Sequence, residues 1–128
     1  NHAYDINLQV AIQPENAVET VVSNSNFKYM YWTMSQQLAH HTINGCRVNS
    51  GDMMGSGTIS GPTPDSYGSM LELSWGGQKP LKMNDGSERK FINDNDTVII
   101  RGYCQNNEVR IGFGEVSSKL LPALDLKF

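Results

Sequence analysis

Residues 97–113 read TVIIRGYCQNNEVRIGF, and this stretch decides the fold class. Residues 97–103 and 107–113 are short runs that contain β-branched and aromatic residues, which favour strands. Gln105-Asn106-Asn107 lies between them and is a turn signal, because asparagine tolerates the backbone conformations that turns require. The stretch therefore predicts two neighbouring strands joined by a tight turn.

The same reasoning extends outward to the rest of the chain. Apolar residues alternate with period two near the start, at Tyr4, Ile6, Leu8, Val10 and Ile12. Further strands are predicted at 18–23, 52–59, 69–75, 80–83 and 88–92. One amphipathic helix is predicted at about 26–42, because residues recur there at helical spacing: Phe27, Met30, Tyr31, Met34, Leu38 and His41. Ser25 or Asn26 is the expected N-cap, and Asn44-Gly45 the expected end.

These elements predict a mainly-β or α+β fold, with one helix packed on mostly antiparallel strands. A chain of 128 residues forms one domain by default, here residues 1–128. Its 38% hydrophobic and 18% charged residues are typical of a soluble globular domain. The net charge of −3 and the lack of a Lys/Arg cluster argue against nucleic acid and anionic membranes as partners. No apolar run reaches the length of a membrane span.

The two cysteines, Cys46 and Cys104, have no metal-ligand or redox-motif spacing. We expect both to be free, buried thiols of a cytosolic protein. Cys46 has no nearby base that would make it a nucleophile, so a packed thiol is the better interpretation.

Three other polar motifs have ordinary interpretations. His40 and His41 are adjacent on the predicted helix, so their side chains point about 100° apart and cannot easily chelate one ion. Asp94 and Asp96 lie in an NDND turn that lacks the glycine and glutamate of a calcium-binding loop. Residues 55–58 are glycine-rich but lack a phosphate-loop motif, which leaves only a possible contact between Thr58 and a carboxylate or carbonyl group.

Glu72 is the sharpest candidate, because it lies between Leu71 and Leu73 in a predicted strand. If its face of the strand is in solvent, the residue is an ordinary surface carboxylate. If that face lines a cleft, a carboxylate that follows a Gly/Pro-rich loop can orient a histidine or a water molecule. Periodicity alone leaves both interpretations open.

Four stretches carry a resemblance to a known family. They read FKYMYWTMSQQLAHHTINGC, GSGTISGPTPDSYGSMLELSW, VIIRGYCQNNEVRIGFG and LLPAL. From about Tyr4 to Leu124 the chain resembles the C-terminal part of the fumarylacetoacetases. Smaller relatives in the superfamily usually show G-T-P-x-G where this chain has residues 57–62, and they lack the QQLAHH…NGC helix. The match is therefore to the fumarylacetoacetases proper.

The resemblance implies a fold, a reaction and partners. The fold is a mixed β-sandwich-roll that forms the C-terminal part of a catalytic domain. The reaction is hydrolysis of the C–C bond of 4-fumarylacetoacetate to fumarate and acetoacetate, the last step of tyrosine breakdown. Such enzymes are cytosolic homodimers that use Mg²⁺ or Ca²⁺. Glu72 matches the carboxylate that orients the general-base histidine, and Thr58 matches a threonine that contacts the substrate.

The resemblance also implies that several parts of the enzyme lie upstream of this chain. These are the N-terminal barrel, the metal ligands and the base histidine, since His2, His40 and His41 do not match the base by motif. We therefore expect the chain to be a C-terminal piece that is inactive alone. Two alternatives stay open: a non-catalytic, β-rich dimerisation or binding module, and another superfamily reaction such as acylpyruvate hydrolysis.

Overall fold

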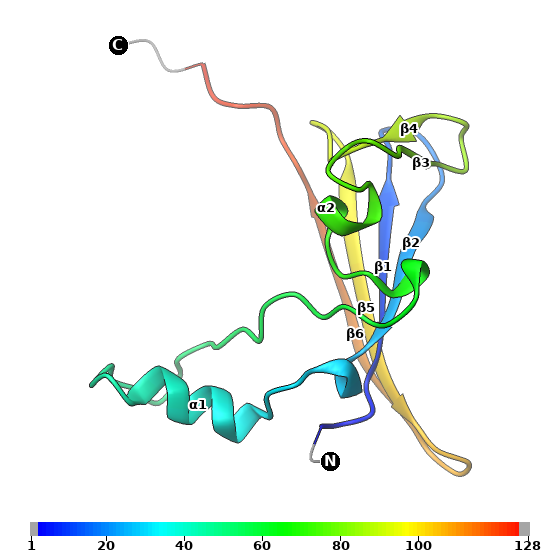
Figure 1. Cartoon of the computed structure of the whole chain (residues 1–128). Coiled ribbons are helices and arrows are strands. Elements are labelled where there is room, and N and C mark those ends of the chain that lie inside the picture. Colours follow the sequence, from blue (N-terminus) through cyan, green and yellow to red (C-terminus); the bar gives the residue numbers. More distant parts are fainter. Residues whose placement is uncertain (1–2, 126–128) are drawn as a thin grey trace.

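The computed structural model describes residues 3–125. Its elements, in chain order, are β1 (Asn7–Gln13), β2 (Thr20–Asn26), the 3-10 turn η1 (Phe27–Tyr29), α1 (Met34–Thr42), the 3-10 turn η2 (Pro64–Ser66), α2 (Met70–Leu73), β3 (Leu81–Lys82), β4 (Glu88–Arg89), β5 (Thr97–Gln105) and β6 (Arg110–Lys119). Figure 1 shows one long twisted sheet with the short elements on one side and α1 extending away from it. Within residues 3–125, no helix has the length and apolar character needed to span a bilayer.

The main sheet has four antiparallel strands in the order β2-β1-β5-β6, and β3 and β4 form a small second sheet. The predicted mainly-β, α+β fold class is therefore confirmed. The hairpin predicted from residues 97–103 and 107–113 is present as β5 and β6, but β6 begins three residues later and runs further, because residues 107–109 belong to the turn. Asn106 shapes its turn, because the Asn106 side-chain oxygen accepts hydrogen bonds from the backbone N–H groups of Glu108 and Val109 at 2.9 and 2.7 Å.

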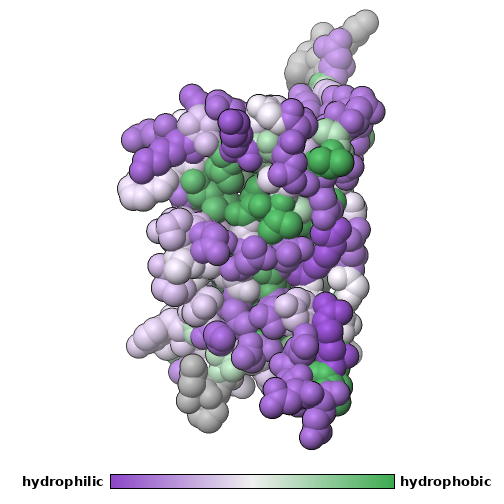
Figure 2. Space-filling view, turned by 90° about the vertical axis from the view of Figure 1, so that its right-hand side faces the viewer, coloured by the Kyte–Doolittle hydropathy of each residue, from purple (hydrophilic) through white to green (hydrophobic). Residues whose placement is uncertain are grey.

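The two faces of the sheet differ in charge, although buried apolar residues occur on both: Ala11 and Ile99 share a face with Arg101, and Ile12 lies on the other. On one face, Arg101 donates hydrogen bonds to Glu115 of β6 and to Glu19 at distances of 2.7 to 2.8 Å. On the other face, β1 pairs Val10 with Ile100 and Ile12 with Val98, and residues 67–73 lie over these apolar side chains. In Figure 2 the largest group of hydrophobic side chains lies in the upper half of the view, with hydrophilic side chains above and below it. Hydrophobic side chains are thus exposed at the surface seen in this view.

A buried ion pair fixes the start of β5. Both carboxylate oxygens of Asp96 accept hydrogen bonds from Arg89, at 2.7 and 2.8 Å, and Asp96 also accepts from the backbone N–H of Asn93. The side chain of Asp96 is 1% exposed and that of Arg89 is 11% exposed. The Arg89 guanidinium holds the pKa of Asp96 below its ordinary value, against the opposing effect of burial. The NDND turn is therefore structural.

The helix predicted at 26–42 is shorter in the structure. Asn26 caps only η1, and Met30 is extended, so the regular pattern of apolar residues crosses a break. α1 begins after Thr33, which forms a capping box with Gln36, and every residue of α1 is exposed or half-buried. The prediction that an amphipathic helix packs on the sheet is therefore wrong. Phe27 is the only apolar residue of the predicted segment that reaches the core, and it lies in η1.

Two predicted strands are also wrong. Residues 52–59 form no regular element, and Gly57 has a φ of 79° that a strand does not allow. Residues 69–75 contain α2 instead. Ser69 caps this turn by accepting from the backbone N–H of Glu72, and Trp75 and Gly76 end it with φ values of 51° and 64°. The Ser-x-x-Glu spacing is a helix-start signal that outweighed the apparent alternation.

Candidate functional site

Two serines of β2 anchor a loop that lies over the sheet. Ser23 Oγ donates to the carbonyl oxygen of Tyr67 at 2.7 Å, and Ser25 Oγ donates to the carbonyl oxygen of Ile59 at 3.0 Å. These bonds satisfy backbone carbonyls that have left regular secondary structure. They fix both ends of residues 59–67, and we call residues 58–74 the Glu72 segment.

Two glycines let the Glu72 segment fold closely on itself. A Cβ atom on Gly68 would lie 2.5 Å from the carbonyl oxygen of Ile59, and one on Gly61 would collide with Ser66 Oγ. Both contacts are far closer than van der Waals contact, so neither position has space for a side chain. The two halves of the loop can therefore lie close together, and Ser60 comes next to Glu72.

Glu72 is half-buried on α2 and held by two hydroxyl groups. Ser60 Oγ donates to the two carboxylate oxygens at 3.0 and 2.8 Å, and Ser69 Oγ donates to Oε2 at 2.8 Å. These hydrogen bonds, the one from Ser60 first, hold the pKa of Glu72 below its ordinary value although burial opposes them. The carboxylate is therefore ionised and oriented before any substrate or base arrives.

Thr58 and Glu72 line the same hollow. Its volume is about 490 Å³, and its walls also contain Tyr29 and Tyr31 from the segment around η1. The residue that begins the Glu72 segment and the carboxylate near its end thus meet at one surface. A hydroxyl, a carboxylate and two phenol rings are groups that can bind a polar organic acid and hold a partner base.

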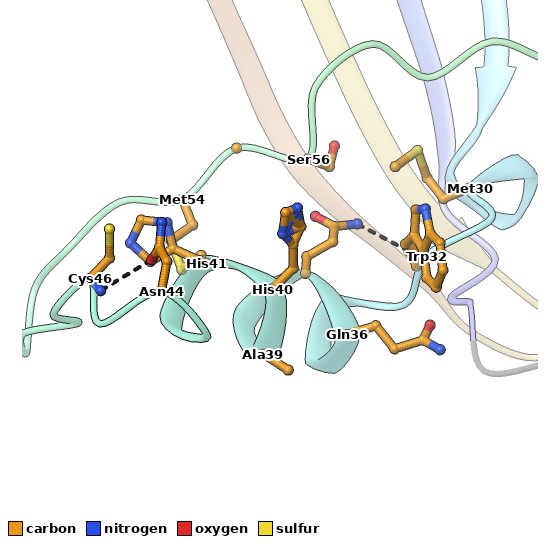
Figure 3. A pocket seen from close by; sticks show the side chains of 12 residues that line it. Met30, Trp32, Gln36, Ala39, His40, His41, Asn44, Cys46, Met54 and Ser56 are labelled. Carbon is orange, nitrogen blue, oxygen red and sulfur yellow. Dashed lines mark hydrogen bonds between the residues drawn. The ribbon is translucent and has the colours of Figure 1, made fainter.

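His40 and His41 lie elsewhere, on the arm that we define as residues 32–57. His40 and His41 border a larger hollow of about 680 Å³ between α1 and residues 54–56. Figure 3 shows His41 beside Asn44 and Met54, while His40 stands apart, nearer the middle of the helix. The side chains that line this hollow include neither an aspartate nor a glutamate. The smaller hollow with Glu72 is therefore the better candidate for chemistry.

Neither cysteine is a buried core thiol. Both are free, but Cys46 is exposed on the arm and Cys104 is half-buried in β5. The expectation of buried thiols is therefore wrong for both, and most clearly for Cys46, because the arm does not pack on the sheet. The backbone N–H of Cys46 donates to the side-chain oxygen of Asn44, which makes a local turn after α1 (Figure 3).

The described residues do not fit a metal centre. Within residues 3–125, no three His, Cys, Asp or Glu side chains lie close enough to hold an ion together. Glu72 has serine partners, and Asp96 uses both oxygens on Arg89. His2 lies outside the described residues.

Sequence reasoning found Glu72 and Thr58 but missed Ser60 and Ser69. Ser69 could have been found from the Ser-x-x-Glu spacing, which is a capping signal. Ser60 is twelve residues from Glu72, and its contact depends on the close approach of backbone at Gly68. A linear pattern carries no signal for such a contact.

Comparisons with known proteins give a consistent result. A family model described as fumarylacetoacetate (FAA) hydrolase C-terminal matches residues 2–120. The fumarylacetoacetase of Homo sapiens is 55% identical over 124 residues, which cover 96% of this chain and 30% of the relative. The fumarylacetoacetase of Dictyostelium discoideum is 56% identical over 126 residues, with the same two coverages. The fumarylacetoacetase of Caenorhabditis elegans is 58% identical over 121 residues, covering 93% of this chain and 28% of the relative. The chain thus spans about 30% of the length of such relatives.

Proposed function

Because the chain belongs to the fumarylacetoacetate hydrolase family, we propose that it is the C-terminal part of the catalytic domain of a fumarylacetoacetate hydrolase. The reaction is the hydrolysis of a C–C bond in 4-fumarylacetoacetate, which yields fumarate and acetoacetate. The identity of 55% over 96% of the chain supports this reaction over other reactions of the superfamily. The observation that carries the proposal is the shared hollow, in which Thr58 lies near an ionised, hydrogen-bonded Glu72.

In this proposal Glu72 acts on a histidine base from outside the chain. Hydrolysis at neutral pH needs a base that removes a proton from water, and imidazole is suited to this role. A carboxylate behind the imidazole fixes its tautomer and stabilises the imidazolium that forms. Glu72 has the properties for this role, because its serine partners keep it charged and limit its rotation.

Thr58 is the proposed substrate contact from this chain. Its hydroxyl can donate a hydrogen bond to a carboxylate or carbonyl oxygen of the substrate. Tyr29 and Tyr31 border the same hollow and supply phenol groups at its rim. Thr58 would therefore help to position the substrate, whereas Glu72 acts on the base.

The complete enzyme is proposed to be a cytosolic homodimer that uses Mg²⁺ or Ca²⁺. A divalent cation supplies charge stabilisation to developing oxyanions. We propose that its ligands come from residues outside this chain, since within residues 3–125 no three His, Cys, Asp or Glu side chains lie together.

The test is turnover of fumarylacetoacetate by the complete gene product, followed by the loss of ultraviolet absorbance. Glu72→Gln is expected to lower kcat by roughly 10²- to 10⁴-fold, the usual contribution of general acid–base groups. Thr58→Val is expected to raise KM more than it lowers kcat. Asp65→Asn is the matched control, because it neutralises an exposed carboxylate in the same segment.

Two results would contradict the proposed role of Glu72 or the proposed substrate. One is unchanged kcat in Glu72→Gln, which would leave the non-catalytic module as the better role for this chain. The other is faster turnover of an acylpyruvate than of fumarylacetoacetate in a substrate panel. Activity of the purified 128-residue chain alone would place a base within it and contradict the proposed division of the site.

A further inference from the structure

We propose that Ser60 and Ser69 are positioning residues for Glu72, which together occupy Oε2 and leave Oε1 as the oxygen that meets the base. This inference rests on the role proposed for Glu72 in the hydrolase reaction. It adds two residues that act through Glu72 and assigns separate tasks to its two oxygens. The contacts that carry it all lie within the Glu72 segment.

Ser60 can only donate toward the carboxylate. The backbone N–H of Gly68 donates to Ser60 Oγ at 3.1 Å, so the hydroxyl oxygen already accepts a hydrogen bond there. Its single proton then points at Glu72, where it is shared between Oε2 at 2.8 Å and Oε1 at 3.0 Å. The close approach of Gly68 to Ile59 fixes this donor in turn, since a side chain at 68 would not fit.

Ser69 is constrained in the same way. Its hydroxyl oxygen accepts from the backbone N–H of Glu72 at 3.3 Å, which makes it the N-cap of α2, and its proton goes to Glu72 Oε2 at 2.8 Å. The cap therefore fixes both the backbone and the side chain of Glu72.

The two carboxylate oxygens are left unequal. Oε2 receives the shorter contact from Ser60 and the whole hydrogen bond from Ser69. Oε1 receives only the longer part of a shared bond, so it keeps the greater capacity to accept a proton donor. The titratable groups that border the same hollow are Tyr29 and Tyr31, and within the described lining Glu72 is the only charged side chain. Oε1 could accept a hydrogen bond from the N–H group of a neutral histidine.

The test compares Ser60→Ala with Ser25→Ala in the complete gene product. Ser25 tethers the neighbouring residue Ile59 but does not contact Glu72, so it controls for loosening of the loop. The first readout is the ¹³C shift of the Glu72 carboxyl carbon against pH, assigned by its disappearance in Glu72→Gln. We expect the titration midpoint to rise in Ser60→Ala, to stay unchanged in Ser25→Ala and to return toward the original value in Ser60→Thr.

The second readout is turnover. We expect Ser60→Ala to lower kcat roughly 10- to 100-fold with little change in KM, as for the loss of a hydrogen bond to a charged group. The same substitution should have no further effect in a Glu72→Gln background, because Ser60 acts through Glu72. Equal losses in both backgrounds would overturn the positioning role.

The two readouts separate the inference from the proposed reaction. If the original protein does not turn over fumarylacetoacetate, the reaction is wrong, and the positioning inference falls with it, even if the serines still hold the carboxylate. If it does turn over and the Glu72 titration is the same in Ser60→Ala and the original protein, the reaction stands and the positioning inference is overturned.

Discussion

The Glu72 segment and the arm follow one another in the chain, yet they are held in different ways. Hydrogen bonds from Ser23 and Ser25 attach the Glu72 segment to β2 across 44 and 34 residues of sequence. Side-chain hydrogen bonds in the arm are local, such as the one from Gln37 Nε2 to the carbonyl oxygen of Trp32. The histidine pair, which attracts attention in the sequence, lies on the locally held part, whereas the carboxylate lies on the anchored part.

Under the role proposed for Glu72, the difference teaches that anchoring is a better guide to the site than residue type. A catalytic group must be kept in one geometry by its neighbours. The Glu72 segment meets this requirement through hydroxyl groups and close backbone contacts. The exposed arm does not meet it in this structure, because the residues of α1 have no buried side chain among them.

The largest loss of stability is expected from Asp96→Asn, which breaks the buried ion pair with Arg89. Arg89 is nearly buried, and this change removes its anionic partner. The loss of one partner of a buried ion pair typically destabilises a protein by about 3 to 5 kcal/mol. Urea unfolding measures the change. Asp94→Asn on the same turn is the control, because Asp94 is exposed and its loss should be close to neutral.

The pH dependence of stability follows from the same ion pair. The pKa of Asp96 is lowered in the folded protein, so folding favours the charged form. Its stabilising contribution is complete above the unfolded-state pKa of about 4 and is lost as pH falls through the lower folded-state pKa. Unfolding midpoints measured from pH 6 downward should therefore fall more steeply in the original protein than in Asp96→Asn. Parallel curves would contradict the assignment.

A smaller loss of stability is expected for Gly68→Ala, which tests directly whether the Glu72 segment is held more firmly than the arm. The new Cβ would lie 2.5 Å from a backbone oxygen, so the loop must shift, and overpacking of this kind destabilises by about 1 to 3 kcal/mol. Gly55→Ala in the arm is the matched control, because nothing lies within 4 Å of its added Cβ. Thermal unfolding should distinguish the two variants, and equal midpoints would mean that the Glu72 segment is no better anchored than the arm.

The smallest effect is expected at Thr33→Ala, which removes the capping box of α1. The local stability of the helix should fall by about 1 kcal/mol, the usual value for an N-cap. Global unfolding should not change, since α1 adds no side chain to the core. Hydrogen exchange at the Gln36 and Gln37 amides measures the local effect, with Ser35→Ala as control. A large drop in the global midpoint would show that the arm packs more firmly than described.

The sequence predicted the strands best where local and global preferences agree. The β5–β6 hairpin has strand-forming residues, a turn asparagine and a place in the sheet, and it was correctly predicted. Residues 69–75 show the opposite case. Alternation suggested a strand there, but the capping hydroxyl of Ser69 starts a helical turn and the left-handed Trp75 ends it.

The site shows a similar division. Glu72 and Thr58 could be predicted because the resemblance identifies them, and the structure places both on one hollow. The roles of these two residues stay predictions. The serine contacts could not be predicted, because Ser60 reaches Glu72 only through the fold of the loop around Gly68. The exposed arm was missed for a related reason, since helical periodicity does not tell which surface a helix packs against.

The pairing of β1 with β5 has a consequence for how the chain assembles. The central pairing of the sheet joins β1 to β5, from Asn7 with Tyr103 to Gln13 with Thr97, and both the arm and the Glu72 segment lie in the part of the chain between these two strands. During synthesis, the β1–β2 hairpin can form early. The other edge of β1 can pair only after β5, at residues 97–105, has left the ribosome. Non-local pairing of this kind slows folding, although its entropy cost grows only slowly with loop length. The residues that line the hollow with Glu72 all precede β5 in the chain, so the sheet on which they lie is completed only after they have left the ribosome.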